Sequence, residues 1–215
     1  MKDVFGTAIL DYQLGNYSED LVTSTSISDS DSLPLPYLFR NYSEMPSLEQ
    51  TALKLSKGAV LDIGCGAGSH SLYLKSKDIK VKSIDISEGA IEACRLRGLD
   101  QAYLLDVMDE TNTFDTLLLL MNGSGIFQCL AHTPFVLSHL KTLLNPDGQI
   151  LIDSSDIKYM YEDEDGGYWI DTTKDYYGEL EYTVSYKNQE ATFSWMYLDF
   201  KNLRIACDQV GLKCE

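Results

Sequence analysis

Residues 59–69 read AVLDIGCGAGS, and this stretch decides which fold the chain can adopt. Its first half holds Val60, Leu61 and Ile63, the aliphatic residues that a buried parallel strand favours. Its second half repeats glycine, which lets the backbone turn sharply and approach a ligand closely. A helix that begins near Ala67 would direct its unpaired N–H groups at the same point. The stretch therefore predicts a strand, a turn and a helix that together bind a nucleotide-like small molecule.

The spacing of the glycines separates two kinds of nucleotide. Gly64, Gly66 and Gly68 run as G-x-G-x-G. The dinucleotide fingerprint G-x-G-x-x-G would place a glycine where this chain has Ser69. Asp62 stands two residues before the first glycine, and an acid there suits a positively charged cofactor better than a pyrophosphate.

The segment DIGCGAG resembles the first motif of the class I S-adenosylmethionine (SAM) dependent methyltransferases, whose cofactor carries an ammonium and a sulfonium group. The resemblance extends over about residues 48–155. It implies an α/β fold, a Rossmann-like doubly wound sheet, that binds SAM and leaves S-adenosylhomocysteine (SAH) as the product. The contacts to SAM implied by this first motif are Asp62, Gly64, Cys65, Gly66 and Gly68.

Composition narrows the class of protein and its partners. A chain of 215 residues with 44% hydrophobic content is expected to form one globular domain. Seventeen basic against thirty-three acidic residues give a net charge of -16, which repels phosphate backbones and anionic lipids. Nucleic acid and membranes are therefore not expected as partners. The five cysteines form no C-x-x-C pair, and neither a signal peptide nor a bilayer-spanning apolar run is present, so a cytoplasmic protein is expected.

Residues 1–46 precede the resemblance and are expected to form a lid or linker segment. Residues 18–32 are almost all Ser, Thr, Asp or Glu, which indicates a mobile surface linker. The alternative is a lid that orders when cofactor or substrate binds, as the resembled family often carries. Within this segment Arg40 and Tyr42 are candidate substrate residues. Arg40 has the fork geometry for a carboxylate of SAM or substrate, and a surface ion pair is the alternative.

From residue 47 onward the chain alternates helix and strand, which predicts a parallel sheet with right-handed crossovers. The first helix is predicted over 48–56 from the capping-box form of residues 47–50. Its spacing places Leu48, Ala52 and Leu55 on the buried face. The domain of SAM-binding methyltransferase type is expected to run over 47–215.

An acid ends the second predicted strand, which covers residues 80–86. Asp85 lies 21 residues after Gly64, where an acid accepts hydrogen bonds from both ribose hydroxyls of a nucleotide. Ile86 would then flank the adenine. A loop aspartate that caps the next helix, over 88–97, is the alternative interpretation.

Two further strands also end in candidate cofactor residues. The third, over 101–107, ends near Asp106, and the resemblance implies an acid here for the adenine amino group, with the amide of Val107 on a ring nitrogen. The fourth ends before Asn122 and Gly123, at the edge where open α/β sheets bind ligands. These two residues should lie under the methionine part of SAM. The Asn/Asp-Pro-Pro-aromatic sequence of enzymes that methylate flipped bases is absent at this point.

Residues 157–198 are expected to form an insertion on the substrate side of the site. Its acid-rich part, 161–182, indicates a solvated loop, or alternatively an acidic and aromatic wall for a cationic or amine substrate. A β-hairpin is predicted over 179–198. The sequence ends at Glu215 where a sixth strand would begin, so the edge of the sheet is incomplete. A continuation of the chain, the hairpin, or a second copy in a homodimer are three ways to cover that edge.

Methyl transfer from SAM needs positioning and desolvation more than covalent help. A general base is needed only where the acceptor keeps a proton, and His132 and Asp153 are candidates among the substrate residues. No catalytic residue and no metal site is assigned. The predicted function is transfer of a methyl group from SAM to a small-molecule acceptor. The alternatives are a non-catalytic SAM-binding or scaffold protein, and an NAD-type oxidoreductase.

Overall fold

The structure is a computed structural model, and it describes residues 2–163, 165–170 and 175–215. Its central element is a parallel sheet in the order β5-β4-β3-β6-β7. The strand order reverses between β3 and β6, which is the switch point of a doubly wound sheet. The fold class predicted from the sequence is thereby confirmed. The strands of this sheet are β3 (Val60–Ile63), β4 (Val81–Asp85), β5 (Ala102–Leu104), β6 (Phe114–Leu119) and β7 (Leu144–Ile152).

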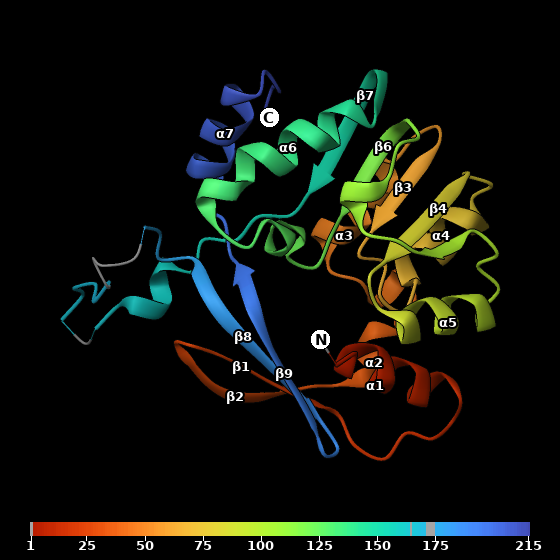
Figure 1. The fold of residues 1–215 in the computed structure, drawn as a ribbon, viewed down its shortest axis with the longest axis horizontal. Coiled ribbons are helices and arrows are strands. Elements are labelled where there is room, and N and C mark those ends of the chain that lie inside the picture. The colour runs from red at the N-terminus through yellow and green to blue at the C-terminus, as the bar shows by residue number, and fades with distance from the viewer. Residues whose placement is uncertain (1, 164, 171–174) are drawn as a thin grey trace.

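Helices pack on both faces of this sheet (Figure 1). Leu61 and Leu117 pack with α6 and α7 on one face, while Val60 and Leu118 pack with α3 and α4 on the other. Because this sheet is covered on both faces, all four residues of β3 are buried, and three of them are aliphatic. These helices, with α5 beside β4 and β5, are α3 (Ser47–Leu55), α4 (Ser69–Ser76), α5 (Glu88–Leu96), α6 (Thr133–Thr142) and α7 (Phe200–Gln209).

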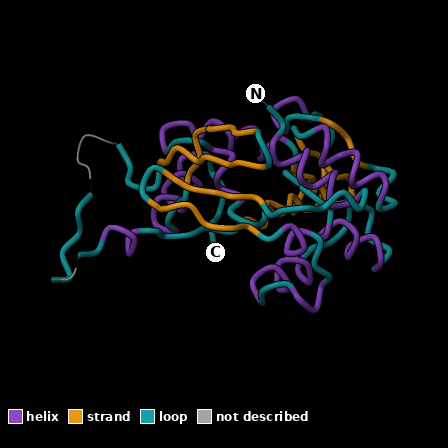
Figure 2. The backbone as a smooth tube through the Cα atoms, turned by 90° about the horizontal axis from the view of Figure 1, so that it is seen from below, coloured by secondary structure: helices purple, strands orange, loops and turns teal. Residues whose placement is uncertain are grey.

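A second, antiparallel sheet has the strand order β2-β1-β8-β9. Figure 2 looks toward this sheet from below and shows its strands side by side. One face packs on α1 (Val4–Gln13) through an apolar cluster that includes Leu21 and Tyr186. The other face is polar, with Thr183 and Thr192 hydroxyls 2.9 Å apart across β8 and β9. The strands are β1 (Leu21–Thr25), β2 (Ser28–Leu33), β8 (Glu179–Tyr186) and β9 (Gln189–Met196).

This second sheet corrects the interpretation of residues 18–32 as a surface linker. β1 pairs with β8, with Val22 opposite Ser185, and Leu21 is fully buried. Composition indicated a linker because few of these residues are apolar. Within this segment β1 and β2 pair with each other, and the strand that joins them to the sheet, β8, lies far along the chain, where no local pattern shows it as a partner. Residues 1–46 and the insertion 157–198, expected as two separate additions, therefore contribute strands to one sheet.

The short helical turns lie mostly in the connections. In Figure 1 the parallel strands run toward α1 and the second sheet, so their carboxyl ends face that part of the molecule. After β2 the chain passes through Pro34 into a short helical turn that begins at Leu35. The short elements are α2 (Leu35–Leu38), η1 (Tyr42–Glu44), η2 (Val107–Asp109), η3 (Gly123–Phe127), η4 (Leu130–His132) and η5 (Lys158–Tyr161).

Two expectations about the packed surfaces are wrong. In α3, Leu48 and Leu55 are 54% and 55% exposed, while Glu49 is buried, because ion pairs hold the Glu49 carboxylate inside. Residues 212–215 form no sixth strand. Gly211 has a φ of 68° and ends α7 in a left-handed turn, after which the Leu212 amide donates to the Cys207 carbonyl at 2.9 Å.

The outer edge of the parallel sheet is β7, and the hairpin of β8 and β9 does not cover it, because that hairpin pairs with β1. In the described ranges, the structure contains no helix with both the length and the apolar composition to cross a bilayer.

Candidate active site

The glycine turn after β3 leaves open space beside two of its residues. Gly64 and Gly66 have φ of 69° and 51°, a region that side chains disfavour. A Cβ added to either would meet no atom of the described chain within 4 Å. A Cβ on Gly68 would instead collide with Leu99 and Cys94. The first two glycines therefore border the space for a ligand, and the third allows close packing of the turn on α5.

One thiol from α5 and the guanidinium of the residue that ends this helix hold two carbonyl groups of the turn. The Cys94 thiol donates to the Gly66 carbonyl, with sulfur and oxygen 3.2 Å apart, and lies 3.8 Å from the Cys65 sulfur. Arg97 Nη1 donates to the Ala67 carbonyl at 2.5 Å. The turn is thus fixed from the side of α5, while its other side is open.

Asp85 ends β4 next to the glycine turn, as the sequence predicted. Its Oδ2 accepts from the Gly66 amide and its Oδ1 from the Ser87 amide, both at 2.9 Å. Burial raises the pKa of the Asp85 carboxyl, and these two amide hydrogen bonds oppose that rise. Each carboxylate oxygen keeps a further lone pair, so the group has the capacity to accept from ribose hydroxyls as well. Beside it, Ile86 is 77% exposed.

The turn after β5 carries the residues predicted to contact adenine. Asp106 is exposed and its carboxylate accepts from the Met108 amide at 2.9 Å, while the Val107 carbonyl accepts from His139 Nε2 at 2.8 Å. Glu110 follows them and is buried, with its Oε2 2.5 Å from Lys82 Nζ of β4.

We predict that Glu110 stabilises this turn and that its contribution to the free energy of unfolding depends on pH. Burial alone would raise the pKa of Glu110, but Lys82, Asn112 and Thr111 outweigh it and lower that pKa from 4.5 to about 2. Because this pKa is lower in the folded protein, the ionised Glu110 contributes its full share to the free energy of unfolding above pH 4.5. That contribution is lost as the pH falls toward 2. Glu110→Gln should therefore lower the free energy of unfolding near neutral pH by about 1–3 kcal/mol, because it leaves the Lys82 ammonium without its carboxylate partner.

Urea unfolding of both proteins between about pH 3 and 7 tests this, since the difference between them should shrink below pH 4.5. A difference that stays constant across this range would contradict the assignment.

Asp153 fixes the turn after β6. Its two carboxylate oxygens accept from the amides of Asn122 and Gly123, at 2.7 and 2.6 Å. Met121 and Asn122 both have positive φ, 63° and 62°, which costs free energy for residues other than glycine. Asp153, predicted as a candidate base, thus has a positioning contact with a strained turn at the carboxyl end of the sheet.

Asp62 and His132 both make hydrogen bonds or ring contacts within the chain. The Asp62 carboxylate is buried, and it accepts from the Ser71 hydroxyl at 2.6 Å. Burial raises the pKa of Asp62. His132 Nδ1 lies 3.3 Å from the Phe127 carbonyl, and its ring stacks on Phe135 with centroids 5.2 Å apart.

Arg40 is buried and contacts a carboxylate inside the protein. Its Nη2 lies 2.6 and 2.5 Å from the two Glu49 oxygens, and Nη1 donates to the Tyr37 carbonyl. His70 Nε2 lies 2.7 Å from the same carboxylate. This is a buried ion cluster rather than a surface pair, and the guanidinium binds an internal carboxylate. Tyr42 stacks on Tyr73, with centroids 4.0 Å apart.

Sequence reasoning missed a group of aromatic side chains between α1 and the second sheet, which we call the aromatic cluster: Phe5, Tyr182, Phe193 and Trp195. Neighbouring rings in this cluster have centroids between 5.5 and 6.4 Å apart. The alternation YTVSY and ATFSW in the hairpin was the signal that could have found three of them. Burial raises the pKa of Tyr182, so its hydroxyl is neutral.

Two contacts join the aromatic cluster to the turn after β6. Trp195 packs against Gly125, where an added Cβ would overlap with the indole. Asn122 Nδ2 donates to the Met196 carbonyl at 3.1 Å.

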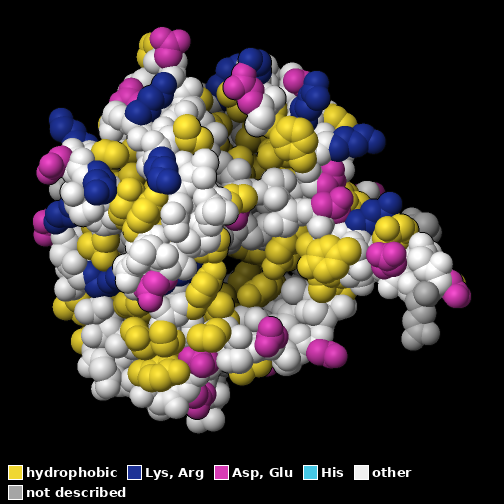
Figure 3. All heavy atoms as spheres, turned by 180° about the vertical axis from the view of Figure 1, so that it is seen from behind, with side chains coloured by type: hydrophobic (Ala, Val, Ile, Leu, Met, Phe, Trp, Pro, Cys, Tyr) yellow, Lys and Arg dark blue, Asp and Glu magenta, His cyan; other side chains and the backbone are white. Residues whose placement is uncertain are grey.

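Figure 3 shows a hollow on the rear face of the molecule with hydrophobic side chains on its walls. In the described chain, no group of three or more His, Cys, Asp or Glu residues is arranged to hold a metal ion.

Comparison with known proteins agrees with this geometry. Residues 54–192 match the model of a methyltransferase domain family. A crystal structure of a SAM-dependent methyltransferase from Bacteroides fragilis, in complex with SAH, is 41% identical and superposes with a TM-score of 0.92, covering 100% of this chain and 88% of that one. The open space beside the glycine turn and the Asp85 carboxylate fit that cofactor, and the NAD-type oxidoreductase alternative is not supported.

Two more distant proteins mark the limits of the likeness. A malonyl-[acyl-carrier protein] O-methyltransferase from Serratia marcescens is 27% identical over 92 residues, which are 43% of this chain and 36% of that protein. The match therefore spans about a third of that relative's length. A sugar N-methyltransferase from Streptoalloteichus is 14% identical with a TM-score of 0.54, over 89% of this chain and 90% of that one, and shares the fold. From the family model and the Bacteroides fragilis structure, the chain belongs to the family of SAM-dependent methyltransferases, with SAM as cofactor and SAH as product.

Proposed function

We propose that the protein methylates a small-molecule acceptor, which binds between the carboxyl edge of the parallel sheet and the aromatic cluster. The observation that carries this proposal is the contact between Trp195 and Gly125, because it fixes the aromatic rings beside the turn of Asn122 and Gly123. Aromatic faces of this kind bind flat or cationic groups. The net charge of -16 supports a small acceptor over a nucleic acid.

The chain contributes position and exclusion of water to the reaction. When bound, SAM supplies an electrophilic methyl group on a sulfonium. The acceptor's lone pair would form the bond to the methyl carbon as the carbon–sulfur bond breaks with its electron pair left on sulfur, and a proton on the acceptor atom would be released to water. The Asp153 carboxylate holds the turn at Asn122 and Gly123, and the rings of the aromatic cluster orient the acceptor for in-line attack.

The N-terminal segment is connected by hydrogen bonds to the elements beside this site, where it would act as a cover. Asp3 caps α1 through the Gly6 amide and also accepts from the Ser87 hydroxyl and the Gly89 amide, at 3.0 and 2.9 Å. These bonds tie α1 to the start of α5, directly after Asp85. We propose that residues 1–46 act with the insertion 157–198 as the substrate-side wall of the site.

The test is formation of SAH from SAM with a panel of small amines, alcohols, phenols and carboxylic acids, with RNA and DNA as controls. We expect turnover with at least one small acceptor. Trp195→Ala should then raise KM for that acceptor by about tenfold or more, while the affinity for SAH changes little, because the ring contacts the acceptor rather than the cofactor.

Phe200→Ala is the matched control, since this aromatic side chain is 53% exposed on α7. If the protein binds SAH but produces no SAH from SAM with any acceptor in the panel, the result would favour the alternative of a non-catalytic SAM-binding protein. An unchanged acceptor KM in Trp195→Ala would remove the aromatic cluster from the acceptor site.

A further inference from the structure

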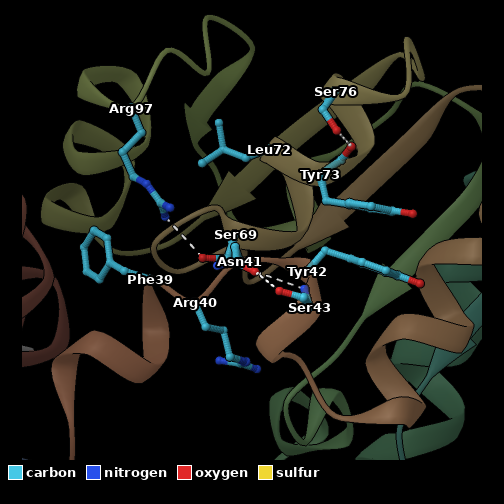
Figure 4. A pocket seen from close by; sticks show the side chains of 10 residues that line it. All are labelled: Phe39, Arg40, Asn41, Tyr42, Ser43, Ser69, Leu72, Tyr73, Ser76 and Arg97. Carbon is cyan, nitrogen blue, oxygen red and sulfur yellow. Dashed lines mark hydrogen bonds between the residues drawn. The ribbon is translucent and has the colours of Figure 1, made fainter.

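A second cavity lies between α4, the end of α5 and the segment that follows α2. Its volume is about 480 Å³, within the range of small-molecule sites. None of the predicted cofactor-binding residues lines it. Figure 4 shows Arg97 reaching from α5 toward Ser69 at the start of α4, with Phe39 beside it and Leu72 and Tyr73 on α4. The proposed acceptor site does not account for this cavity.

The charge of the lining is unusual for such an acidic protein. Arg40 and Arg97 line the cavity, and none of the described residues that line it is acidic, although the chain has 33 acidic and 17 basic residues. Arg40 is neutralised by Glu49. No carboxylate in the described ranges pairs with Arg97. The cavity therefore carries one uncompensated positive charge.

Arg97 has donors left for a ligand. Its Nη1 donates to the Ala67 carbonyl at 2.5 Å and to the Ser69 hydroxyl at 3.2 Å. A guanidinium has five N–H donors in a planar fork that matches carboxylate and phosphate oxygens. Nε and Nη2 donate to none of the residues that the structure describes. Burial lowers the pKa of Arg97, and a bound anion would reverse that effect.

The remaining walls suit an apolar body on the ligand. The Arg97 guanidinium lies 4.7 Å from the centroid of the Phe39 ring. The stacked rings of Tyr42 and Tyr73 form another wall, with Lys77 Nζ 5.5 Å from the Tyr73 centroid. Flat aromatic surfaces beside a cation select a ligand that carries both an anionic and an apolar group.

We propose that this cavity is a second ligand site, which takes a small organic anion with a carboxylate or phosphate group on an apolar or aromatic body. Arg97 is shared between the cavity and the glycine turn, because the same Nη1 holds the Ala67 carbonyl. A ligand that engages Arg97 therefore changes how firmly the turn is held. By reciprocity, the ligand and the cofactor alter each other's affinity by the same factor.

The test is calorimetric titration of the full chain, without SAM, with phenyl phosphate and with benzoate. Inorganic phosphate and benzyl alcohol supply the anionic and the apolar group separately. We expect saturable binding of phenyl phosphate or benzoate, whichever anion the site prefers, and weaker binding of the two partial ligands. Arg97→Gln should weaken binding about tenfold or more, the usual effect of losing a charge-assisted hydrogen bond.

Arg204→Gln is the matched control, because Arg204 is exposed on α7, outside the cavity. This variant should bind phenyl phosphate or benzoate with the affinity of the natural protein. Absence of saturable binding of both phenyl phosphate and benzoate to the natural protein would overturn the proposal, as would equal binding to folded Arg97→Gln. If Arg97→Gln does not fold, Arg97→Lys replaces it, since it keeps the charge and loses the fork.

Two measurements separate this site from the cofactor site. Asp85→Asn should lose SAH binding and keep phenyl phosphate binding. The proposal of a second ligand site can therefore fail independently of the proposed methyl transfer. In the natural protein, saturating phenyl phosphate should shift SAH affinity to a limit, as coupled sites do. A shift that grows without limit would show direct competition in one site, and no shift would remove the coupling through Arg97.

Discussion

Asp85→Asn should abolish useful binding of SAH while leaving the protein folded. The carboxylate accepts amide hydrogen bonds that hold the glycine turn, and we expect it to accept from the ribose hydroxyls of the bound cofactor as well. An amide can accept at only one of its two end atoms, so both sets of contacts are impaired. Loss of two hydrogen bonds to a charged group weakens binding by about a hundredfold or more.

Calorimetric titration with SAH measures this effect directly. The matched control is Asp208→Asn, because Asp208 is an exposed acid on α7 outside the sheet edge, and its SAH affinity should equal that of the natural protein. Circular dichroism and urea unfolding establish that both variants are folded. A folded Asp85→Asn protein that binds SAH within about threefold of the natural affinity, a difference of well under 1 kcal/mol, would remove Asp85 from the cofactor site.

Glu49→Gln should destabilise the protein more than any other single substitution proposed above. The side chains of Arg40 and Glu49 are only 4% and 7% exposed, and His70 shares the same carboxylate. Burial raises the pKa of Glu49, and the hydrogen bonds from His70 and Arg40 outweigh that effect and lower it. Removing this charge leaves the Arg40 guanidinium buried without a counterion, which costs about 3–5 kcal/mol.

Urea unfolding near neutral pH tests this second prediction. Glu92→Gln on α5 is the control, because Glu92 is exposed and such surface changes stay within about 0.5 kcal/mol. The double variant Arg40→Met/Glu49→Leu should recover much of the lost stability, because it removes both charges. If Glu49→Gln lowers the free energy of unfolding by less than about 1 kcal/mol, the Arg40–Glu49 pair behaves as an exposed ion pair does. That result would contradict the burial of this cluster.

The parts of the fold that sequence could predict are those fixed by local pattern. The glycine turn, the aliphatic β3 and the acid at the end of β4 each follow from residue type and spacing over a few positions. The physical requirement is also local, since a strand buried on both faces must be aliphatic and a turn with positive φ favours glycine. The predicted parallel sheet and the position of Asp85 at its carboxyl edge followed from these patterns.

The parts that sequence could not predict depend on partners that lie far apart in the chain. Residues 21–25 join a larger sheet because β8 pairs with them on the side opposite β2. Glu49 is buried in place of Leu48 because Arg40 and His70 meet it there. Apolar periodicity alone places a leucine inward and a glutamate outward, and only the tertiary ion cluster reverses that order.

The same reasoning applies to the site. Asp153 was a candidate base, but its contacts with two amides became visible only when β7 was placed beside β6. The aromatic cluster combines rings from α1 and from the hairpin, two segments at opposite ends of the sequence. Its position next to Gly125 depends on how the second sheet docks on the first.

A crystal structure of the full chain with SAH tests the central claim most directly. We expect both ribose hydroxyls to lie within about 3.2 Å of the Asp85 carboxylate. We also expect the sulfur of SAH to face the space between the turn of Asn122 and Gly123 and the indole of Trp195. SAH bound away from the carboxyl edge of the parallel sheet, or with its ribose hydroxyls on other groups and its sulfur remote from Trp195, would contradict the proposed site.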